Sequence, residues 1–394
     1  MADRWMARRS LYYGMFVLAA FLAVGGRFWQ LEVVHAGEYA KLARQDYLRK
    51  LPIPAPRGKI ITADGVTIAT SKPSWTVYYL NRAGPMPAAE VSRLAQYLHL
   101  SLQTIEQQVQ NGMKTLPAYE PIEITGGLTP AQMTAVEENI SQLPNIRIQP
   151  VAVRSYPYGE VMGNIIGYVS RIDAQQYQAL HNQGYSLTSL VGSAGLEASY
   201  EQYLHGRAGG QYAEVNRQGQ LVRLYGQTVP TPGDTLHLTI NWRLEETAQR
   251  ALQFVMQAMQ QTKSPVAHSP TANRGAVVAL NPNNGDILAM ASLPSYDPNR
   301  LLPNNLAERS RYYDQLKSNP LDPFQNRVIQ GWYAPGSIFK PLMAVAALAS
   351  HTVTPTTEIF DPGYFPRLPS MHNWYTPGFG WLNIDQAIGL SDDT

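Results

Sequence analysis

The most informative stretch of the chain leads into the apolar run 342–349 and reads Tyr333-Ala334-Pro335-Gly336-Ser337-Ile338-Phe339-Lys340-Pro341. Pro335 and Gly336 interrupt the incoming backbone, so a helix is predicted to begin at Ser337 or just after it. Ser337 and Lys340 then lie three residues apart on one helical face, where an amine can meet a hydroxyl. Pro341 fits this helix because it falls within the first turn, where its missing N–H costs least.

The sequence gives arguments for and against a chemical role of this pair. An S-x-x-K spacing is expected by chance on the order of once in a chain of this length. A serine at a helix start is also an ordinary N-cap. The apolar run after Lys340, however, is expected to bury the amine and favour its uncharged form, which could take the proton from Ser337. Ser391-Asp392-Asp393 follows a helix predicted over 384–389 and, in isolation, is more readily explained as a polar helix end.

The composition excludes several classes of protein. The chain has 394 residues, a length that indicates two or three domains. Hydrophobic residues make up 44% and charged residues 15%, which excludes a disordered chain, and a formal net charge of +2 gives no surplus for binding nucleic acid. The sequence contains no cysteine, which excludes disulfides, thiolate metal sites and a cysteine nucleophile. The many Gly, Pro and Tyr residues favour a mixed α+β fold.

The N-terminal region is predicted to anchor the chain in the cytoplasmic membrane. No charged side chain occurs from Ser10 to Gly26, and a helix within an anchor segment 10–30 is long enough to span the hydrocarbon core. Arginines in the tail 1–9 place this tail in the cytoplasm and the bulk of the chain outside the membrane, by the positive-inside rule. Two alternatives remain, which are a buried core helix and a cleavable signal peptide with a site near Ala23-Val24-Gly25.

Residues between the anchor and about 235 are predicted to mix strands with helices. The segment 57–69 reads as a short hairpin around the turn pair Asp64-Gly65. Residues 88–145 read as helical, and Pro130 is expected to open a helix that runs to about residue 140. Two glycine-punctuated segments are interpreted as scaffold rather than as sites, and these are 154–168 and 192–206.

A second domain is predicted to begin near residue 236. Residues 235–240 alternate as a strand does, and apolar residues recur at three- and four-residue steps over 244–259. Residues 276–280 and 287–291 flank a turn and form the clearest hairpin of the chain. These elements predict a helix packed on an antiparallel sheet.

Several short motifs occur in a particular order before the serine stretch, namely Arg57-Gly58, Asp64-Gly65, Tyr156-Pro157, Gly163, Gly167-Tyr168, Gly195-Leu196-Glu197, Gly275-Ala276-Val277-Val278 and Asn326-Arg327. In this order the chain resembles the class B penicillin-binding proteins from its anchor to its end. Residues 330–340 resemble the elongation type of that family more than the division type. The resemblance implies an elongated pedestal over residues 31–235 and the N-terminal part of a serine transpeptidase domain, of the penicillin-binding and β-lactamase-like fold, over residues 236–394.

The resemblance also implies an activity and its residues. Ser337 corresponds to the acylated nucleophile and Lys340 to the catalytic base of a peptidoglycan D,D-transpeptidase. Ser391 and Asp393 match the second motif in its S-x-D form, with Ser391 relaying a proton to the leaving D-alanine. The substrates implied are peptidoglycan stem peptides ending in D-Ala–D-Ala, and β-lactams are expected to trap Ser337 because they mimic that terminus.

The family further implies a role in cell elongation and cell shape, with a RodA-type SEDS glycosyltransferase as the partner of the transmembrane helix and the pedestal. Two alternatives to a transpeptidase stay open. One is a D,D-carboxypeptidase or β-lactamase-type hydrolase, in which water releases the acyl-enzyme. The other is a membrane-anchored scaffold without catalytic activity.

The third motif of the family, Lys-Ser/Thr-Gly, does not occur in the sequence, which stops at Thr394. In the family, that strand supplies an oxyanion-hole N–H and contacts to the substrate carboxylate. The 394 residues are therefore not expected to catalyse the reaction by themselves.

Some members of the family bind zinc near the second motif. Of the four ligand positions only Asp361 matches, because the others hold Asn373, Phe379 and Asp392. A different site made from Asp361, His372 and Asp385 is the weaker alternative. We therefore expect no metal, and the resemblance implies no cofactor.

Overall fold

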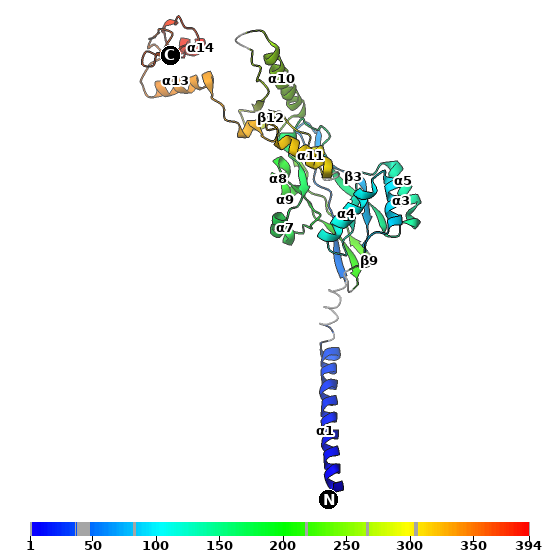
Figure 1. Ribbon diagram of the computed structural model, residues 1–394. Helices are drawn as coiled ribbons and strands as arrows, with labels where there is room; N and C mark the ends of the chain where they lie inside the picture. The colour runs from blue at the N-terminus through cyan, green and yellow to red at the C-terminus, as the bar shows by residue number, and fades with distance from the viewer. Residues whose placement is uncertain are drawn as a thin grey trace. The chain divides into compact units, whose positions relative to one another are not determined.

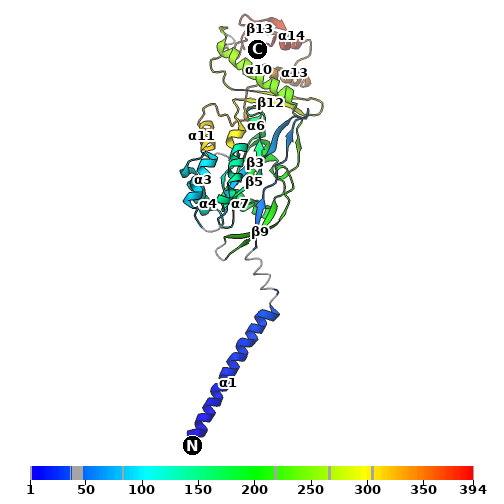
Figure 2. The same ribbon diagram turned by 90° about the vertical axis from the view of Figure 1, so that its right-hand side faces the viewer.

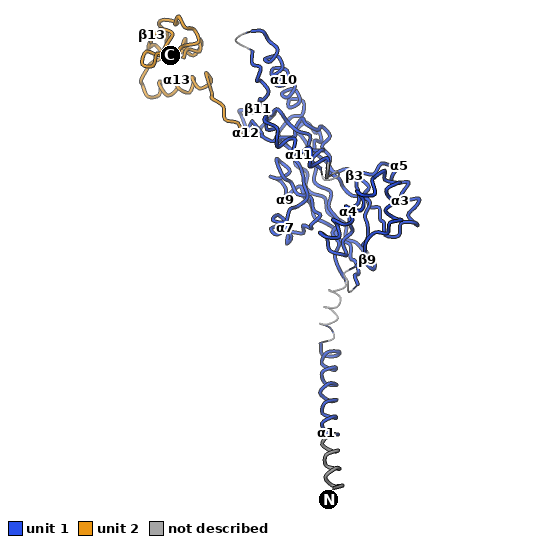
Figure 3. Tube along the Cα trace, in the orientation of Figure 1, with its two compact units in different colours: residues 1–329 blue, residues 330–394 orange. Residues whose placement is uncertain are grey.

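The computed structural model describes residues 2–35, 37, 48–81, 84–216, 220–264, 268–302 and 306–393. It divides into two compact units, residues 1–329 and residues 330–394 (Figure 3). Each unit contains both helices and strands, which confirms the predicted α+β class. The predicted boundary between residues 235 and 236 remains a prediction.

The N-terminal helix α1 (Ala2–Trp29) continues as the π-helical turn η1 (Gln30–Val34) (Figure 1). Within it, residues Gly14–Val34 form a stretch long and apolar enough to cross a membrane, and none of this stretch is buried. The alternative of a buried core helix is therefore wrong. The apolar stretch ends four residues later than predicted, because the helix continues through Val33 and Val34.

Two sheets follow in the first unit. The three-stranded antiparallel sheet has the order β1-β8-β9, and the other sheet has the order β10-β2-β3-β4 with β5 also paired to β3. The strands are β1 (Leu48–Ile53), β2 (Ile60–Ile61), β3 (Thr67–Tyr79), β4 (Ile122–Thr125), β5 (Ile146–Ser155), β8 (Gly209–Val215), β9 (Leu221–Thr228) and β10 (Leu236–His237).

The Asp64-Gly65 turn joins β2 to β3 as predicted, with Gly65 at a φ of +82°. The predicted strand 235–240 is shorter than expected. Only Leu236 and His237 pair, and they pair in parallel with β2 of the five-stranded sheet rather than opening a new one. The reason is that residues 238–241 turn toward the start of the next helix, where Asn241 provides the N-cap.

Helices cover one face of β3 and β4 (Figures 1 and 2). They are α3 (Ala88–Leu98), α4 (Leu102–Thr115) and α5 (Pro130–Glu138), followed by the 3₁₀ turn η2 (Ile140–Gln142). Pro130 begins α5 as predicted, because Thr129 and Gln132 form a capping box before it. The strand β4 was not predicted, since its alternating Ile122 and Ile124 lie inside a polar segment that reads as helical.

The glycine-punctuated segments and the residues between them form small elements. These are α6 (Gly163–Ile166), β6 (Val169–Arg171), α7 (Ala174–Leu180), η3 (His181–Gln183), β7 (Leu190–Gly192), α8 (Gly195–Ser199) and α9 (Glu201–Leu204). A Cβ atom on Gly167 would lie 1.9 Å from the carbonyl oxygen of Ala194. The glycine at this position therefore permits backbone contact, which is the scaffold role that the sequence predicts.

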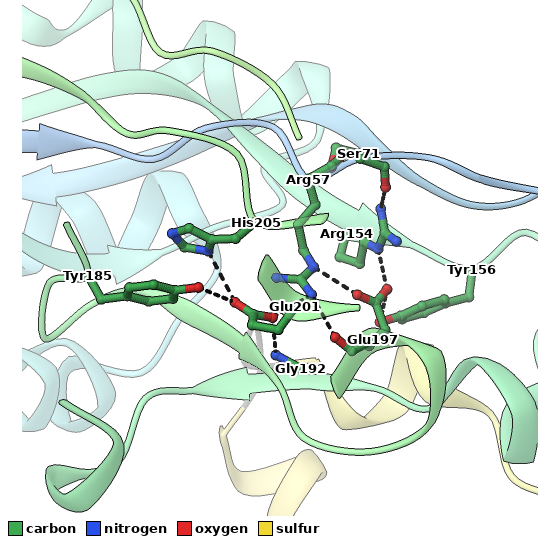
Figure 4. A network of polar contacts seen from close by, with 10 residues as sticks. Arg57, Ser71, Arg154, Tyr156, Tyr185, Gly192, Glu197, Glu201 and His205 are labelled. Carbon is green, nitrogen blue, oxygen red and sulfur yellow. Dashed lines mark hydrogen bonds and ion pairs between the residues drawn. The ribbon is translucent and has the colours of Figure 1, made fainter. Parts of the chain in front are cut away.

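A buried ionic network joins three of the family-like motifs (Figure 4). The two oxygens of the Glu197 carboxylate each bind one arginine, at 2.8 Å to Arg57 Nε and 2.6 Å to Arg154 Nε. The Tyr156 hydroxyl donates to Glu197 Oε1 at 3.2 Å, and Arg57 Nη2 also binds Glu201 Oε2 at 2.7 Å. Arg57, Tyr156 and Glu197 thus come from separate motifs and meet in one structural cluster.

Glu201 extends this network to the edge of the cluster. Its carboxylate accepts hydrogen bonds from the Tyr185 hydroxyl at 2.9 Å and the Gly192 N–H at 2.8 Å, and pairs with His205 Nδ1 at 3.3 Å (Figure 4). Burial acts to raise the pKa of Glu201, but the contacts with His205, Arg57 and Gly192 outweigh it and lower the pKa to about 2.

The rest of the first unit places a helix on a hairpin. Helix α10 packs on the antiparallel pair β11 and β12, as predicted, and Glu245 of α10 accepts a hydrogen bond from Met290 N–H at 2.6 Å. The predicted packing face of this helix is wrong, because Leu244, Val255 and Met259 of the apolar repeat are exposed. Leu252 and Met256 lie beside Gly275 of β11 instead. Short elements then lead to residue 330. The bounds are α10 (Trp242–Gln261), β11 (Gly275–Leu280), β12 (Ile287–Leu293), η4 (Pro298–Leu301), α11 (Leu306–Lys317) and α12 (Arg327–Gln330).

Candidate active site

All four predicted site residues lie in the second unit. This unit contains η5 (Gly336–Phe339), α13 (Lys340–Ala349), β13 (Ile359–Asp361), β14 (Gly380–Leu382) and α14 (Ile384–Leu390). Ser337 lies in the 3₁₀ turn η5, and Lys340 is the first residue of α13. Pro341 falls in the first turn of α13, as predicted. Ser337 does not act as the N-cap of either element, so capping does not explain its position.

The side chains of the serine motif and the second motif meet in a line of hydrogen bonds. The Ser391 hydroxyl donates to Ser337 Oγ at 2.8 Å. Lys340 Nζ donates to Ser391 Oγ at 3.1 Å, to the Ser391 carbonyl oxygen at 2.6 Å and to Asp393 Oδ1 at 2.6 Å. The amine thus reaches Ser337 through the hydroxyl of Ser391, whereas the sequence predicted a direct meeting of amine and hydroxyl.

The surroundings of Lys340 differ from the prediction. The apolar run was expected to bury the amine, but Leu342, Met343 and Val345 of α13 are themselves exposed. The Lys340 side chain is 23% exposed, and its ammonium group is paired with the carboxylate of Asp393, which is 42% exposed. The predicted apolar burial of the lysine is therefore wrong, because oxygen atoms from residues 391 and 393 surround its amine instead.

The local backbone explains how Ser391 presents two groups to one amine. Ser391 ends α14 in the left-handed conformation, with φ +55° and ψ +43°. Its N–H donates to the Ile388 carbonyl and the N–H of Asp392 donates to the Ala387 carbonyl, which closes the helix end. A non-glycine residue at positive φ costs free energy and persists where its surroundings fix it. The turn directs the hydroxyl and the carbonyl of Ser391 toward Lys340.

The four positions compared with a zinc site also come together, as a hydrogen-bonded cluster. The buried carboxylate of Asp361 accepts from Asn373 Nδ2 and from the N–H of Phe379, each at 2.8 Å, and Asn373 Nδ2 also donates to Asp392 Oδ1. Among residues that the structure describes, no three or more His, Cys, Asp and Glu side chains form a group suited to a metal ion.

Sequence reasoning did not identify Asn373 as a site residue. It lies 12 residues from Asp361 and 19 from Asp392, so no local spacing connects the three. The zinc pattern of the family groups Asn373 with Asp361 and Asp392, but only the folded structure shows its amide between the two carboxylates.

Two family models of known proteins match the chain, one on each side of residue 250. The family model described as "Penicillin-binding Protein dimerisation domain" matches residues 52–238. The model described as "Penicillin binding protein transpeptidase domain" matches residues 275–394, a range that includes Ser337, Lys340, Ser391 and Asp393.

Two of the curated relatives that match the chain carry the same name. The peptidoglycan D,D-transpeptidase MrdA of Acinetobacter baumannii is 30% identical over 96% of this chain and 53% of its own length. The protein of the same name from Escherichia coli K12 is 28% identical over 98% of this chain and 59% of its own length. The chain thus spans somewhat more than half the length of these relatives.

Solved structures share the fold. The complex between PBP2 and MreC from Helicobacter pylori matches with a TM-score of 0.70 over 88% of this chain and 61% of the solved one, at 21% identity. A peptidoglycan synthase complex described as coordinating polymerization and crosslinking matches with a TM-score of 0.61 over 96% of this chain and 62% of the solved one, at 31% identity.

Proposed function

The chain belongs to the class B penicillin-binding proteins of the PBP2 type, and from this membership we propose that it carries the acylation site of a peptidoglycan D,D-transpeptidase. The substrates proposed are stem peptides that end in D-Ala–D-Ala. The observation that carries the proposal is the hydrogen-bonded line from Ser337 through Ser391 to Lys340 and Asp393.

The acylation step follows from this line. The step begins after the Lys340 ammonium has released one proton to solvent. The two hydroxyl groups can then rotate, so that Ser337 donates to Ser391 Oγ and Ser391 donates to the uncharged Lys340 amine. Ser337 Oγ then attacks the carbonyl carbon of the penultimate D-alanine while its proton passes through Ser391 to Lys340. The C–N bond to the terminal D-alanine breaks, and the proton returns through Ser391 to the leaving amine.

The second half of the reaction uses the same groups in reverse. The amine of a neighbouring stem peptide attacks the ester carbon and loses its proton toward Ser391 and Lys340, which restores Ser337 and leaves a peptide cross-link. Asp393 keeps the Lys340 amine in reach of the Ser391 hydroxyl through its 2.6 Å contact. A β-lactam ring would open on Ser337 Oγ in the same first step and remain as an ester.

The cellular role proposed is cell-wall synthesis during elongation, at the cytoplasmic membrane. The helix α1 fits a single-pass membrane anchor, and the arginines before it support a cytoplasmic N-terminus with the bulk of the chain outside. The partner proposed is a RodA-type SEDS glycosyltransferase, which would contact α1 and the pedestal. Support comes from the similar peptidoglycan synthase complex that coordinates polymerization with crosslinking.

Covalent labelling of the full-length protein with a fluorescent penicillin tests the acylation site. We expect labelling of the wild type and of Ser350→Ala, a serine at the end of α13, and loss of labelling in Ser337→Ala. Label that survives Ser337→Ala would remove the assignment of the nucleophile. Failure of both wild type and variants to react would favour the non-catalytic scaffold.

A product analysis separates transpeptidation from hydrolysis. The protein is incubated with a D-Ala–D-Ala peptide, with and without an added amine acceptor, and the products are separated by mass. Acceptor-dependent cross-linked product supports the transpeptidase. Release of free acid at the same rate in both mixtures would instead indicate a carboxypeptidase or β-lactamase type of enzyme.

A further inference from the structure

A buried carboxylate at the end of β13 organises the loops beside the candidate active site. Asp361 is only 2% exposed. Its Oδ1 accepts from the N–H of Gly363 at 2.6 Å, and its Oδ2 accepts from the N–H of Phe379 and from Asn373 Nδ2, both at 2.8 Å. A buried carboxylate with such donors holds its neighbours in place, because moving any of these groups costs the carboxylate a hydrogen bond.

The side chain of Asn373 connects this carboxylate to the second motif. Asn373 is also 2% exposed, and its Nδ2 donates both to Asp361 and to Asp392 Oδ1. A primary amide has two N–H donors, so one nitrogen serves both carboxylates. Its backbone N–H also binds the carbonyl of Gly363 at 2.9 Å, which holds Asn373 on the same loop as Asp361.

The hydrogen bond between Asn373 and Asp392 restrains the second motif because of where Asp392 lies in the chain. Asp392 lies between Ser391 and Asp393, the two residues whose oxygens bind Lys340 Nζ. The hydrogen bond from Asn373 to Asp392 therefore limits the movement of Ser391 and Asp393. It acts at a turn where Ser391 has a positive φ. Near the other side of this turn, Trp374 Nε1 donates to the Leu390 carbonyl at 3.0 Å.

The neutral charge of the Asn373 amide suits its position between two carboxylates. Asp361 and Asp392 are two carboxylates that share one neighbour, and a neutral amide between them supplies a hydrogen bond to each without adding charge. A third carboxylate at this position would repel both, and an apolar side chain would leave the buried Asp361 without one of its donors.

We propose that Asn373 is a positioning residue for acylation. Its amide ties Asp392 to the buried Asp361 and so holds Ser391 and Asp393 against Lys340. This inference rests on the proposed function, because it assigns the tie to the geometry of that reaction.

The test measures the acylation rate constant and the dissociation constant for a fluorescent penicillin separately, in the full-length protein. Asn373→Leu removes both donors and keeps the number and branching of the side-chain heavy atoms. We expect its acylation rate constant to fall by between about 10-fold and about 100-fold, as for a misplacement of reacting groups of about 1 Å, with little change in the dissociation constant. Circular dichroism confirms that the variant is folded.

A conservative variant and a structural control give the test its specificity. Asp392→Asn retains an acceptor oxygen for the Asn373 amide, so its rate is expected to stay close to that of the wild type, whereas Asp392→Leu is expected to fall like Asn373→Leu. The double variant Asn373→Leu/Asp392→Leu should be no slower than either single leucine variant. Asn383→Ala removes the N-cap of α14 and should lower stability while the acylation rate of the folded protein is kept.

Several results would overturn the inference. They are a folded Asn373→Leu protein that reacts at the wild-type rate, an equal loss in Asn383→Ala, or additive losses in the double variant. If Asn373→Leu does not fold, the comparison of Asp392→Leu with Asp392→Asn decides by the same criterion. A wild type that does not react at all would overturn the proposed function, while a reacting wild type with unaffected variants would overturn only the role of Asn373.

Discussion

The main chain of Tyr156 and the side chain of Asn299 are joined by two hydrogen bonds. The N–H of Tyr156 donates to Asn299 Oδ1 at 2.9 Å, and Asn299 Nδ2 donates to the Tyr156 carbonyl at 2.8 Å. Tyr156 lies in the part matched by the dimerisation-domain model and Asn299 in the part matched by the transpeptidase model. Because the Tyr156 hydroxyl also binds Glu197, the buried ionic network is linked directly to the first elements of the transpeptidase region.

Removing the Asn299 amide should weaken this junction. Asn299→Leu leaves the N–H and carbonyl of Tyr156 without their partner, and we expect a loss of about 2 to 3 kcal/mol in the free energy of unfolding. Urea unfolding followed by circular dichroism measures the change. Asn283→Ala, in the exposed turn between β11 and β12, is the control and should stay within about 0.5 kcal/mol of the wild type. Equal stability of the two variants would contradict a structural junction at Asn299.

Breaking the buried ionic network should lower the free energy of unfolding by more than the loss of the Asn299 amide does. The Arg154 side chain is 1% exposed and that of Glu197 is 0% exposed. Arg154→Met leaves a buried carboxylate with one arginine fewer, and the expected loss is about 3 to 5 kcal/mol in the free energy of unfolding. Arg250→Met removes an arginine that is 75% exposed and paired with Glu246 on α10, and it should change stability by less than about 1 kcal/mol. Similar losses for the two variants would refute the importance of burial.

The lowered pKa of Glu201 predicts a loss of stability in acid. The folded-state pKa is about 2 against an ordinary value of 4.5, so the stabilisation is present above about pH 5 and is lost as the pH falls toward 2. The shift corresponds to about 3 kcal/mol. Unfolding in urea at a series of pH values should therefore show a shallower dependence in Glu201→Gln than in the wild type. Parallel curves for the two proteins would show that Glu201 does not contribute.

Two glycines at positive φ should respond differently to alanine. A Cβ on Gly65 meets no atom within 4 Å, so Gly65→Ala should cost only the backbone strain, about 1 to 2 kcal/mol. A Cβ on Gly167 meets the Ala194 carbonyl oxygen at 1.9 Å, so Gly167→Ala adds overpacking and should cost about 3 kcal/mol or more. Thermal unfolding compares the two. A smaller effect at Gly167 than at Gly65 would be inconsistent with the close backbone contact.

The left-handed conformation of Ser391 separates its backbone role from its chemical role. Ser391→Gly and Ser391→Ala both remove the hydroxyl that lies between Lys340 and Ser337, so both should slow penicillin labelling strongly. Glycine adopts a φ of +55° without strain, so Ser391→Gly should be about 1 kcal/mol more stable than Ser391→Ala. Labelling that remains in both variants would remove Ser391 from the proton path.

The sequence predicted those elements in which local signals agree. The Asp64-Gly65 turn, the helix over residues 244–259 and the start of α5 at Pro130 each combine a pattern with matching turn or cap chemistry, and the structure has all three. The apolar repeat did not predict which face of that helix is buried, because most of its residues are exposed. The strand β4 was missed because its few apolar residues are surrounded by polar ones, and its strand conformation depends on pairing with the distant β3.

Within the site, residue identities were easier to predict than contacts. The motifs indicated Ser337, Lys340, Ser391 and Asp393, and the structure places their side chains in one cluster. The order of contacts could not be predicted, because it depends on the turn at Ser391 and on groups more than 50 residues away along the chain. Local sequence patterns also could not predict the hydrogen bonds from Asn373 to Asp361 and Asp392, because these residues are 12 and 19 positions away from it.

The distance in sequence between the two halves of the site has a consequence for the newly made protein. Lys340 and Asp393 are 53 residues apart, and Ser337 and Ser391 are 54 residues apart. A nascent polypeptide that ends before residue 391 would display the proposed nucleophile without its proton carrier. The candidate acylation site therefore forms only once residues 391–393 dock beside α13, because the serine motif alone lacks the Ser391 hydroxyl and the Asp393 carboxylate.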